Sequence, residues 1–398
     1  MDSRTGLPVV GMVGGGQLAR MTHQAAIALG QSLRVLALSA DEPAALVAPD
    51  VAIGSHTDLA ALRNFAAGCD VLTFDHEQVP TEHLRALTAE GVTVHPGPSA
   101  LVHAQDKLVM RGKLADLGLS VPPFAPVTDV ADVIRFGAAH GWPCVLKATR
   151  GGYDGRGVWM LDSAEDASRL VARLLEAGTS LLVEQRVPML RELAVLAARS
   201  PFGQAAVWPV VETVQRDGTC VEVVAPAPGL RPDRADAAAE LALKVAAELD
   251  VVGVLAVELF ETADGLVVNE LAMRPHNSGH WTIDGAVTSQ FEQHLRAVLD
   301  YPLGATDPLA PVAVMANVLA AADPLAPVTM GVDERLHHLF ARFRQARVHL
   351  YGKAERPGRK VGHVTVLGEQ PDQVRRTASL AAHWLSHAQW ADGYDPHG

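Results

Sequence analysis

The chain has 398 residues, 48% of them hydrophobic and 20% charged, so it is long enough for two or three domains with packed cores. Its 33 basic and 45 acidic residues give a net charge of −12, which repels nucleic acid and anionic membranes. Three cysteines in no CxxC spacing argue against a disulfide framework or a zinc knuckle, and no charge-free stretch reaches the roughly 20 residues of a membrane span. We therefore expect a soluble cytoplasmic protein without nucleic-acid or membrane partners.

The first hundred residues alternate β-rich runs with helical stretches, a pattern typical of a parallel sheet with crossover helices. A turn-rich segment, HPGPS at 95–99, closes this unit. The sequence therefore predicts a Rossmann-like domain over residues 1–98. Its expected strands are 9–13, 34–38, 71–74 and 92–95, and its expected helices are 17–29 and 59–66.

A glycine-rich turn, VGGGQLA at 13–19, follows the first strand and satisfies the GxGxxA form of a dinucleotide fingerprint. A dehydrogenase also needs an acidic residue at the end of the second strand, where this sequence has Ser39. An NAD-dependent oxidoreductase would explain this turn and nothing after residue 100. A small phosphate or carboxylate site and a plain strand-to-helix turn are the other interpretations.

The next segment predicts helices at 101–117 and 130–140, a strand at 143–148 and a glycine-rich loop at 151–157. Lys147 ends the strand, and Arg150 and Arg156 add charge to the loop. Free amides and cations of this kind suit a polyphosphate, although no GKS or GKT follows as a Walker A loop would require. A solvated glycine-rich hairpin is the structural alternative.

A hairpin is predicted at 251–271, after a strand-rich region at 181–224 and a helix at 235–249. If residues 263–265 form its connection and Thr262 opposes Leu266, then Glu258 opposes Glu270 on one face. Two opposed carboxylates are destabilising unless a cation neutralises them, and oxygen ligands beside a phosphate loop favour Mg²⁺, with Mn²⁺ as a substitute. An exposed hairpin with solvated carboxylates fits poorly with its apolar flanks.

Two polar segments follow the hairpin. In RPHNSGHWT at 274–282, two histidines at a spacing of four would suit zinc in a helix, but Pro275 and Gly279 favour a loop that contacts substrate. Segment 349–360 concentrates four cations within eight residues of an acidic protein. A solvated charged face is the usual explanation, whereas the interrupting glycines and prolines favour a shaped loop that captures a phosphomonoester.

These segments, taken in order, resemble the ATP-grasp fold, and within it the N5-carboxyaminoimidazole ribonucleotide synthase family. The resemblance rests on GGGQLARM, RGGYDGRG, NELAMRPHNSGHWT and RPGRKVGH, and it spans nearly the whole chain. It implies an α/β protein with an ATP-grasp domain at 99–300, whose two lobes meet near 184–187, and a small α+β domain at 301–398. It also implies an ATP-dependent ligase of purine synthesis that joins 5-aminoimidazole ribonucleotide and bicarbonate through carboxyphosphate, and a homodimer.

The resemblance also assigns roles to residues. Glu258 and Glu270 would bind the metal, and Lys147 and Arg274 would act in catalysis, with Arg274 near bicarbonate. The linker at 184–187 would read the adenine through its backbone, and Glu192 would hold the ribose. The expected nucleotide site comprises Lys107, Lys147, Gly152, Tyr153, Asp154, Gly155, Arg156, Gly157, Glu184, Gln185, Arg186, Val187, Glu192, Gln215, Asn269 and Glu270. The expected ribonucleotide site comprises Tyr153, Arg156, Arg274, His276, Asn277, Ser278, Lys353, Arg356, Arg359 and Lys360, with Lys353 and Arg359 on the 5′-phosphate.

The sequence departs from the family pattern at a few positions. Lys107 stands where the family often has Arg, which keeps the charge and loses the bidentate fork, and Gln215 stands where a His commonly contacts the nucleotide. Many ATP-grasp enzymes also carry a metal-binding Asn two residues after the second Glu; this chain has Ala272 there, and the narrower family that it resembles shares this absence. Strand alternation points Asn269 to the opposite face from Glu270.

Two other functions fit parts of this pattern. A formate-dependent glycinamide ribonucleotide transformylase would share the ATP site but not the HNSGH segment. A catalytically inactive subunit that binds nucleotide to regulate a partner would not need Lys147, Glu258 and Glu270, all of which are present.

Overall fold

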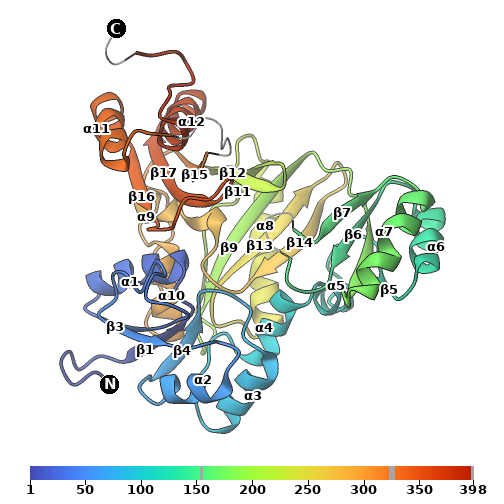
Figure 1. The fold of residues 1–398 in the computed structure, drawn as a ribbon, viewed down its shortest axis with the longest axis horizontal. Helices are drawn as coiled ribbons and strands as arrows, with labels where there is room; N and C mark the ends of the chain where they lie inside the picture. Colours follow the sequence, from blue (N-terminus) through green and yellow to red (C-terminus); the bar gives the residue numbers. More distant parts are fainter. Residues whose placement is uncertain (153–155, 322–327, 396–398) are drawn as a thin grey trace.

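The computed structural model describes residues 1–152, 156–321 and 328–395. A long central sheet joins three peripheral parts: the N-terminal sheet, a small lobe and the C-terminal helices (Figure 1). Among the described residues, no helix combines the length and the apolar character that crossing a membrane would require.

The N-terminal part is the expected parallel sheet, with strand order β3-β2-β1-β4. The segment 92–95, expected as a strand, contributes only an isolated bridge between Leu72 and Val94. Strand β3 and helix α3 were not predicted. The strands are β1 (Val9–Val13), β2 (Ser32–Ala37), β3 (Asp50–Ile53) and β4 (Val71–Phe74), and the helices are α1 (Gln17–Ala28), α2 (Leu59–Ala66) and α3 (Thr81–Ala89).

The single helix expected at 101–117 is two helices, α4 (Pro98–Gln105) and α5 (Lys107–Asp116). Asp106 separates them because its backbone is extended, with φ −133° and ψ 110°. Its carboxylate caps α5 by accepting hydrogen bonds from the Leu108 and Val109 amides, at 3.0 and 3.2 Å. Its other oxygen accepts from Arg150 Nε at 2.8 Å, so the break also anchors the start of the glycine-rich loop.

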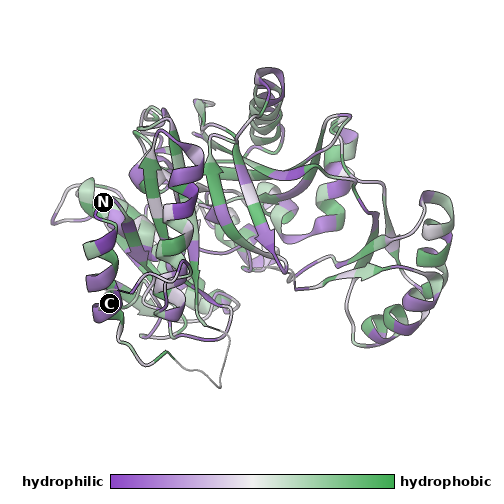
Figure 2. Ribbon diagram, turned by 90° about the horizontal axis from the view of Figure 1, so that it is seen from above, coloured by the Kyte–Doolittle hydropathy of each residue, from purple (hydrophilic) through white to green (hydrophobic). Residues whose placement is uncertain are grey.

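The small lobe is a four-stranded sheet of order β5-β8-β6-β7, with helices α6 and α7 on one face (Figure 1). Its own apolar cluster includes Phe136, Leu146 and Val183. Figure 2 shows this lobe at one end of the molecule, joined to the central sheet by thin connections. Its elements are β5 (Phe124–Val127), α6 (Val130–His140), β6 (Cys144–Ala148), β7 (Val158–Leu161), α7 (Ala164–Glu176) and β8 (Leu181–Gln185).

The central sheet has nine strands, in the order β14-β13-β9-β11-β12-β15-β17-β16, with β10 beside β9. Its strands alternate or run continuously apolar, and α8 (Pro232–Glu248) packs against β9, β10 and β13. The strands are β9 (Arg191–Arg199), β10 (Ala205–Val207), β11 (Val211–Arg216), β12 (Thr219–Ala225), β13 (Gly253–Glu261), β14 (Leu266–Ala272), β15 (Val312–Leu319), β16 (Arg347–Leu350) and β17 (Lys360–Gly368).

The C-terminal strands extend this sheet rather than forming one of their own, because β12 pairs antiparallel with β15. The sequence patterns did not reveal α11 (Val332–Arg342) or α12 (Pro371–His387): α12 packs against β15 and β17, and α11 packs against α12. Helix α10 (Gln290–Val298) packs Leu295 and Val298 into the N-terminal core, and the short α9 (Thr282–Gly285) precedes it. The boundaries at 98/99 and 300/301 stay predictions.

Candidate functional site

The predicted hairpin places Glu258 directly opposite Glu270, as expected, but its turn and its strand register differ from the prediction. Near the turn Glu261, not Thr262, opposes Leu266, so the connection is one residue longer than predicted. The Thr262 hydroxyl closes it by donating to the Gly265 carbonyl at 3.0 Å and accepting from the Gly265 amide at 3.1 Å. A bulge between Glu258 and Leu259 then shifts the register by one and restores the carboxylate pair.

The bulge also corrects the orientation predicted for Asn269. Strand alternation would point it away from Glu270, yet its Nδ2 donates to Glu258 Oε2 at 3.4 Å. Lys147 Nζ donates to Asn269 Oδ1 at 3.3 Å from the small lobe. Alternation fails here because Asn269 is the extra, unpaired residue in the ladder. The side chains of both Asn269 and Glu270 therefore lie on the face of the hairpin that carries the Glu258 carboxylate.

Lys147 and Glu184 form a buried ion network between neighbouring strands of the small lobe. Lys147 Nζ lies 2.7 Å from Glu184 Oε2, and Arg111 Nε lies 2.6 Å from Glu184 Oε1. Burial raises the pKa of Glu184, but the two cations outweigh it and leave that pKa below the usual value. The Glu184 side chain is therefore engaged within the protein, and its strand is paired on both edges at this residue, with Phe124 of β5 and Val145 of β6.

A cluster of carboxylates faces these cations. Lys107 Nζ forms an ion pair with Glu270, and the Gln215 side chain bonds to Glu192. Burial, together with the charges of Glu270 and Glu192, raises the pKa of Glu258 to about 7. Such mutual repulsion is what a bound cation would relieve, so the pair fits a divalent metal with the Asn269 amide beside it.

The glycine-rich loop is described only in part. Tyr153, Asp154 and Gly155 lie outside the described residues. Gly157 has a φ of 75°, and its carbonyl accepts from the Ala148 amide at 2.8 Å, which closes the loop against β6. The backbone of Gly152 lies so close to the Arg156 carbonyl that an added Cβ would come within 2.7 Å of it.

The segment after the hairpin is a loop with a short 3₁₀ turn at Asn277–Gly279. Arg274 Nε donates to Glu77 Oε2 at 2.6 Å, so the guanidinium is held by the N-terminal domain. His276 Nε2 lies 3.4 Å from Glu258 Oε1, whereas His280 bonds to Gln290 at 3.0 Å. The two histidines point to different partners, and among the described residues no three or more His, Cys, Asp or Glu side chains gather to hold a metal ion such as zinc.

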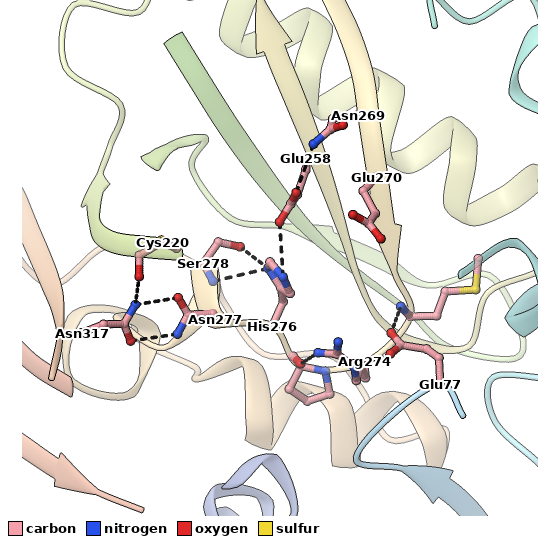
Figure 3. A network of polar contacts seen from close by, with 12 residues as sticks. Glu77, Cys220, Glu258, Asn269, Glu270, Arg274, His276, Asn277, Ser278 and Asn317 are labelled. Carbon is pink, nitrogen blue, oxygen red and sulfur yellow. Dashed lines mark hydrogen bonds and ion pairs between the residues drawn. The ribbon is translucent and has the colours of Figure 1, made fainter. Parts of the chain in front are cut away.

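Asn277 and Ser278, both predicted to contact substrate, have protein partners. Asn277 and Asn317 exchange two side-chain hydrogen bonds, at 3.0 and 2.8 Å (Figure 3). Ser278 is 1% exposed, and its hydroxyl lies 2.9 Å from His276 Nδ1. These contacts shape the loop, and the predicted roles of both residues on the substrate stay predictions.

The basic C-terminal loop meets the N-terminal glycine turn. Lys353 Nζ donates to Gln17 Oε1, and Arg359 donates to the Ala354 carbonyl at 3.1 Å. Gly352 and Gly358 have φ values of 69° and 74°, so the segment turns sharply at both glycines, and its predicted role in capturing a phosphomonoester stays a prediction. Arg356 is exposed, and Lys360 begins β17 within electrostatic reach of Glu258 and His276.

The glycine turn is not arranged for a dinucleotide. Asp75 accepts hydrogen bonds from the Gly16 and Ala19 amides, at 3.1 and 2.7 Å. A methyl group on Gly16 would lie 2.1 Å from Asp75 Oδ2, so the protein's own carboxylate fills the place of a pyrophosphate.

The linker residues lie beside the ion network without a contact to the carboxylate cluster. Gln185 ends β8 and donates to the His140 carbonyl at 3.2 Å, while Arg186 and Val187 continue toward β9. Their predicted role at the adenine stays a prediction.

Sequence reasoning missed Glu77, Arg111, Gln290 and Asn317. Glu77 follows β4, and the carboxyl end of a parallel strand is where polar site residues gather, so its position was a usable signal. Asn317 is the single polar residue in the apolar run VAVMANVL, and this is a weaker signal of a functional residue. Nothing local distinguishes Arg111 from a surface arginine on a helix.

Comparisons with known proteins agree with this geometry. Family models match in chain order: a ribonucleotide synthetase preATP-grasp domain at 7–105, an ATP-grasp domain at 112–291, and a phosphoribosylaminoimidazole carboxylase C-terminal domain at 313–377. The N5-carboxyaminoimidazole ribonucleotide synthase of Mycobacterium tuberculosis is 68% identical over 391 residues, which cover 98% of this chain and 90% of that protein.

Solved structures are similar over almost the whole chain. An ADP complex of an N5-carboxyaminoimidazole ribonucleotide synthetase has a TM-score of 0.86 at 34% identity, covering 96% of this chain and 98% of the other. The synthase of Aspergillus clavatus with ADP and 5-aminoimidazole ribonucleotide has a TM-score of 0.86 at 30% identity, covering 95% and 98%.

Proposed function

The chain belongs to the N5-carboxyaminoimidazole ribonucleotide synthase family of ATP-grasp ligases, and from this premise we propose the reaction and the roles of its residues. The reaction is the ATP-dependent carboxylation of 5-aminoimidazole ribonucleotide with bicarbonate, which gives N5-carboxyaminoimidazole ribonucleotide, ADP and phosphate. One observation supports it most: the opposed carboxylates of Glu258 and Glu270 lie beside the cations Lys107 and Lys147. The basic loop ends at Lys360, within electrostatic reach of Glu258.

The first step makes bicarbonate reactive. A bicarbonate oxygen attacks the γ-phosphorus of ATP, and the bond between that phosphorus and the bridging oxygen of the β-phosphate breaks. The products of this step are carboxyphosphate and ADP, which is the leaving group. Such a transfer depends on positioning and charge neutralisation more than on a protein nucleophile. Lys147 and Lys107 would supply positive charge here, and Arg274, whose Nε donates to Glu77, would hold bicarbonate.

The second step forms the carbamate. The exocyclic amine of the ribonucleotide attacks the carboxyl carbon of carboxyphosphate, or the CO₂ it releases, while inorganic phosphate leaves and the amine loses a proton. Lys353 and Arg359 would bind the 5′-phosphate, and Arg156, with Tyr153 from outside the described residues, would contact the ribonucleotide.

A divalent cation fits the carboxylate pair. Glu258 and Glu270 would hold Mg²⁺, or Mn²⁺, next to the Asn269 amide. When bound, it would neutralise the charge of the β- and γ-phosphates.

We further propose a cytoplasmic homodimer. The three cysteines are free thiols, which suits a reducing compartment. Three apolar side chains of the N-terminal domain are each more than half exposed: Leu38, Leu46 and Ile53. They would provide apolar area for a second copy of the chain. Sedimentation velocity would measure the mass of the protein in solution and so test the dimer.

The reaction is tested by ADP release from the purified protein with Mg-ATP and bicarbonate. We expect 5-aminoimidazole ribonucleotide to stimulate this release strongly, because its amine traps the activated carboxylate. Absence of stimulation in a protein that binds ATP would contradict the proposal. Stimulation by glycinamide ribonucleotide with formate would instead support the transformylase alternative.

Lys353→Ala tests the phosphate assignment. We expect the KM for 5-aminoimidazole ribonucleotide to rise by about tenfold or more, with the KM for ATP within about twofold, because a charge-assisted bond to one substrate is lost. Steady-state kinetics with each substrate varied in turn measures both constants. Lys244→Ala on α8 is the control for loss of a lysine, and an unchanged ribonucleotide KM in Lys353→Ala would remove the assignment.

A further inference from the structure

The loop at 276–278 is held from two sides. Gln290, fully buried at the start of α10, accepts from the His276 amide and donates to the His276 carbonyl, both at 2.8 Å. On the other side, Asn317 of β15 bonds to the Asn277 side chain. Two separate parts of the fold therefore fix adjacent residues of this loop.

The contact between Asn277 and Asn317 is a closed pair of amide hydrogen bonds. Asn317 is 5% exposed, and its Nδ2 donates both to Asn277 Oδ1 at 2.8 Å and to the Cys220 carbonyl at 2.9 Å. Because a carbonyl only accepts, the Cys220 bond requires nitrogen at this position of Asn317. That orientation in turn sets the orientation of the Asn277 amide, so the pair has a single register.

The fixed loop aims His276 at the carboxylate pair. Its Nδ1 accepts from the Ser278 amide at 3.4 Å and lies 2.9 Å from the Ser278 hydroxyl, so the ring proton is on Nε2. Nε2 faces Glu258 Oε1 at 3.4 Å, and Figure 3 shows the sequence of contacts from Asn317 through Asn277 and His276 to Glu258. A shift of the loop would turn this ring away from Glu258.

We infer that Asn317 is a positioning residue for the metal-binding carboxylate: through its amide pair with Asn277 it holds His276 against Glu258. The inference rests on the proposed function, since it takes Glu258 as a metal ligand. Partners that orient a metal ligand set affinity and activity without touching the metal. Asn317 lies on the strand that also pairs with Lys360, so one strand supports both the metal side and the phosphate side of the site.

The test compares Asn317→Ala, Asn277→Ala and the double variant in the full-length protein. We expect each single variant to lower kcat for ADP release by about tenfold to a hundredfold and to weaken Mn²⁺ binding in the presence of ADP by a similar factor. The double variant should be no worse than either single one, because both remove the same pair. Titration followed by electron paramagnetic resonance measures free Mn²⁺ independently of turnover.

Gln293→Ala is the matched control. Gln293 is also a buried amide with two hydrogen bonds, to the Gly304 carbonyl at 2.8 Å and amide at 2.7 Å, but it does not contact the loop. It should lose thermal stability much as Asn317→Ala does while keeping Mn²⁺ affinity within about twofold.

Three outcomes would overturn the inference: wild-type Mn²⁺ affinity in Asn317→Ala, an equal loss of affinity in Gln293→Ala, or multiplied losses in the double variant. Multiplied losses would mean that Asn277 acts directly on substrate. If the wild-type protein binds Mn²⁺ with ADP but shows no ribonucleotide-dependent turnover, the proposed reaction fails, and the Mn²⁺ titrations still decide the role of Asn317.

Discussion

Replacing Glu270 by Gln should lower ribonucleotide-dependent ADP formation by at least about a hundredfold while leaving the fold intact. The substitution keeps the shape of the side chain but removes one of the two opposed carboxylates. It therefore halves the negative charge that would hold a divalent cation, and it leaves Lys107 without its ion-pair partner. Initial rates at saturating ATP, measured over a range of Mg²⁺ concentrations, show whether the loss reflects weak metal binding.

Glu261→Gln on the same hairpin is the control for this experiment. Glu261 lies near the turn, where its carboxylate is 2.6 Å from Arg191 Nε and takes no part in the carboxylate cluster. Its replacement should leave ADP formation within about twofold of the wild-type rate, because only a structural ion pair is lost. Retention of more than about a tenth of the activity in Glu270→Gln would remove the metal assignment.

The second large effect is expected on stability. Replacing Glu184 by Gln should lower the free energy of unfolding by about 3 to 5 kcal/mol, because it leaves two buried cations without a counter-charge. Arg111 is fully buried and Lys147 is 9% exposed, so water cannot take over the lost interaction. Urea unfolding followed by circular dichroism measures the change, provided that the transition is two-state.

A second substitution separates the charge effect from a packing effect. Adding Arg111→Met to Glu184→Gln removes one of the uncompensated cations and should recover part of the lost stability. The surface variant Glu90→Gln, which breaks an exposed pair with Arg63, should change the free energy of unfolding only slightly, because water screens that pair. A loss in Glu184→Gln as small as that of Glu90→Gln would contradict the account of the buried network.

Local patterns in the sequence were sufficient for most of the elements that build the site. The parallel N-terminal sheet, helix α6, strand β6 and the β13–β14 hairpin follow from apolar alternation and from turn residues, which act between neighbours in the chain. The predicted opposition of Glu258 and Glu270 was confirmed, but the predicted turn was wrong. A longer connection and a bulge offset each other, and counting residues alone cannot detect two shifts that cancel.

The sequence by itself determined the family, the order of the domains and which charged residues were candidates for the site, because motif spacing and strand periodicity are local properties. Only the tertiary structure decided what those groups contact. The partners of Arg274, Lys353 and Asn277 are 197, 336 and 40 residues away, at Glu77, Gln17 and Asn317. Such pairs form when separate elements pack together, and burial then requires each polar group to find a partner that no local pattern in the chain specifies.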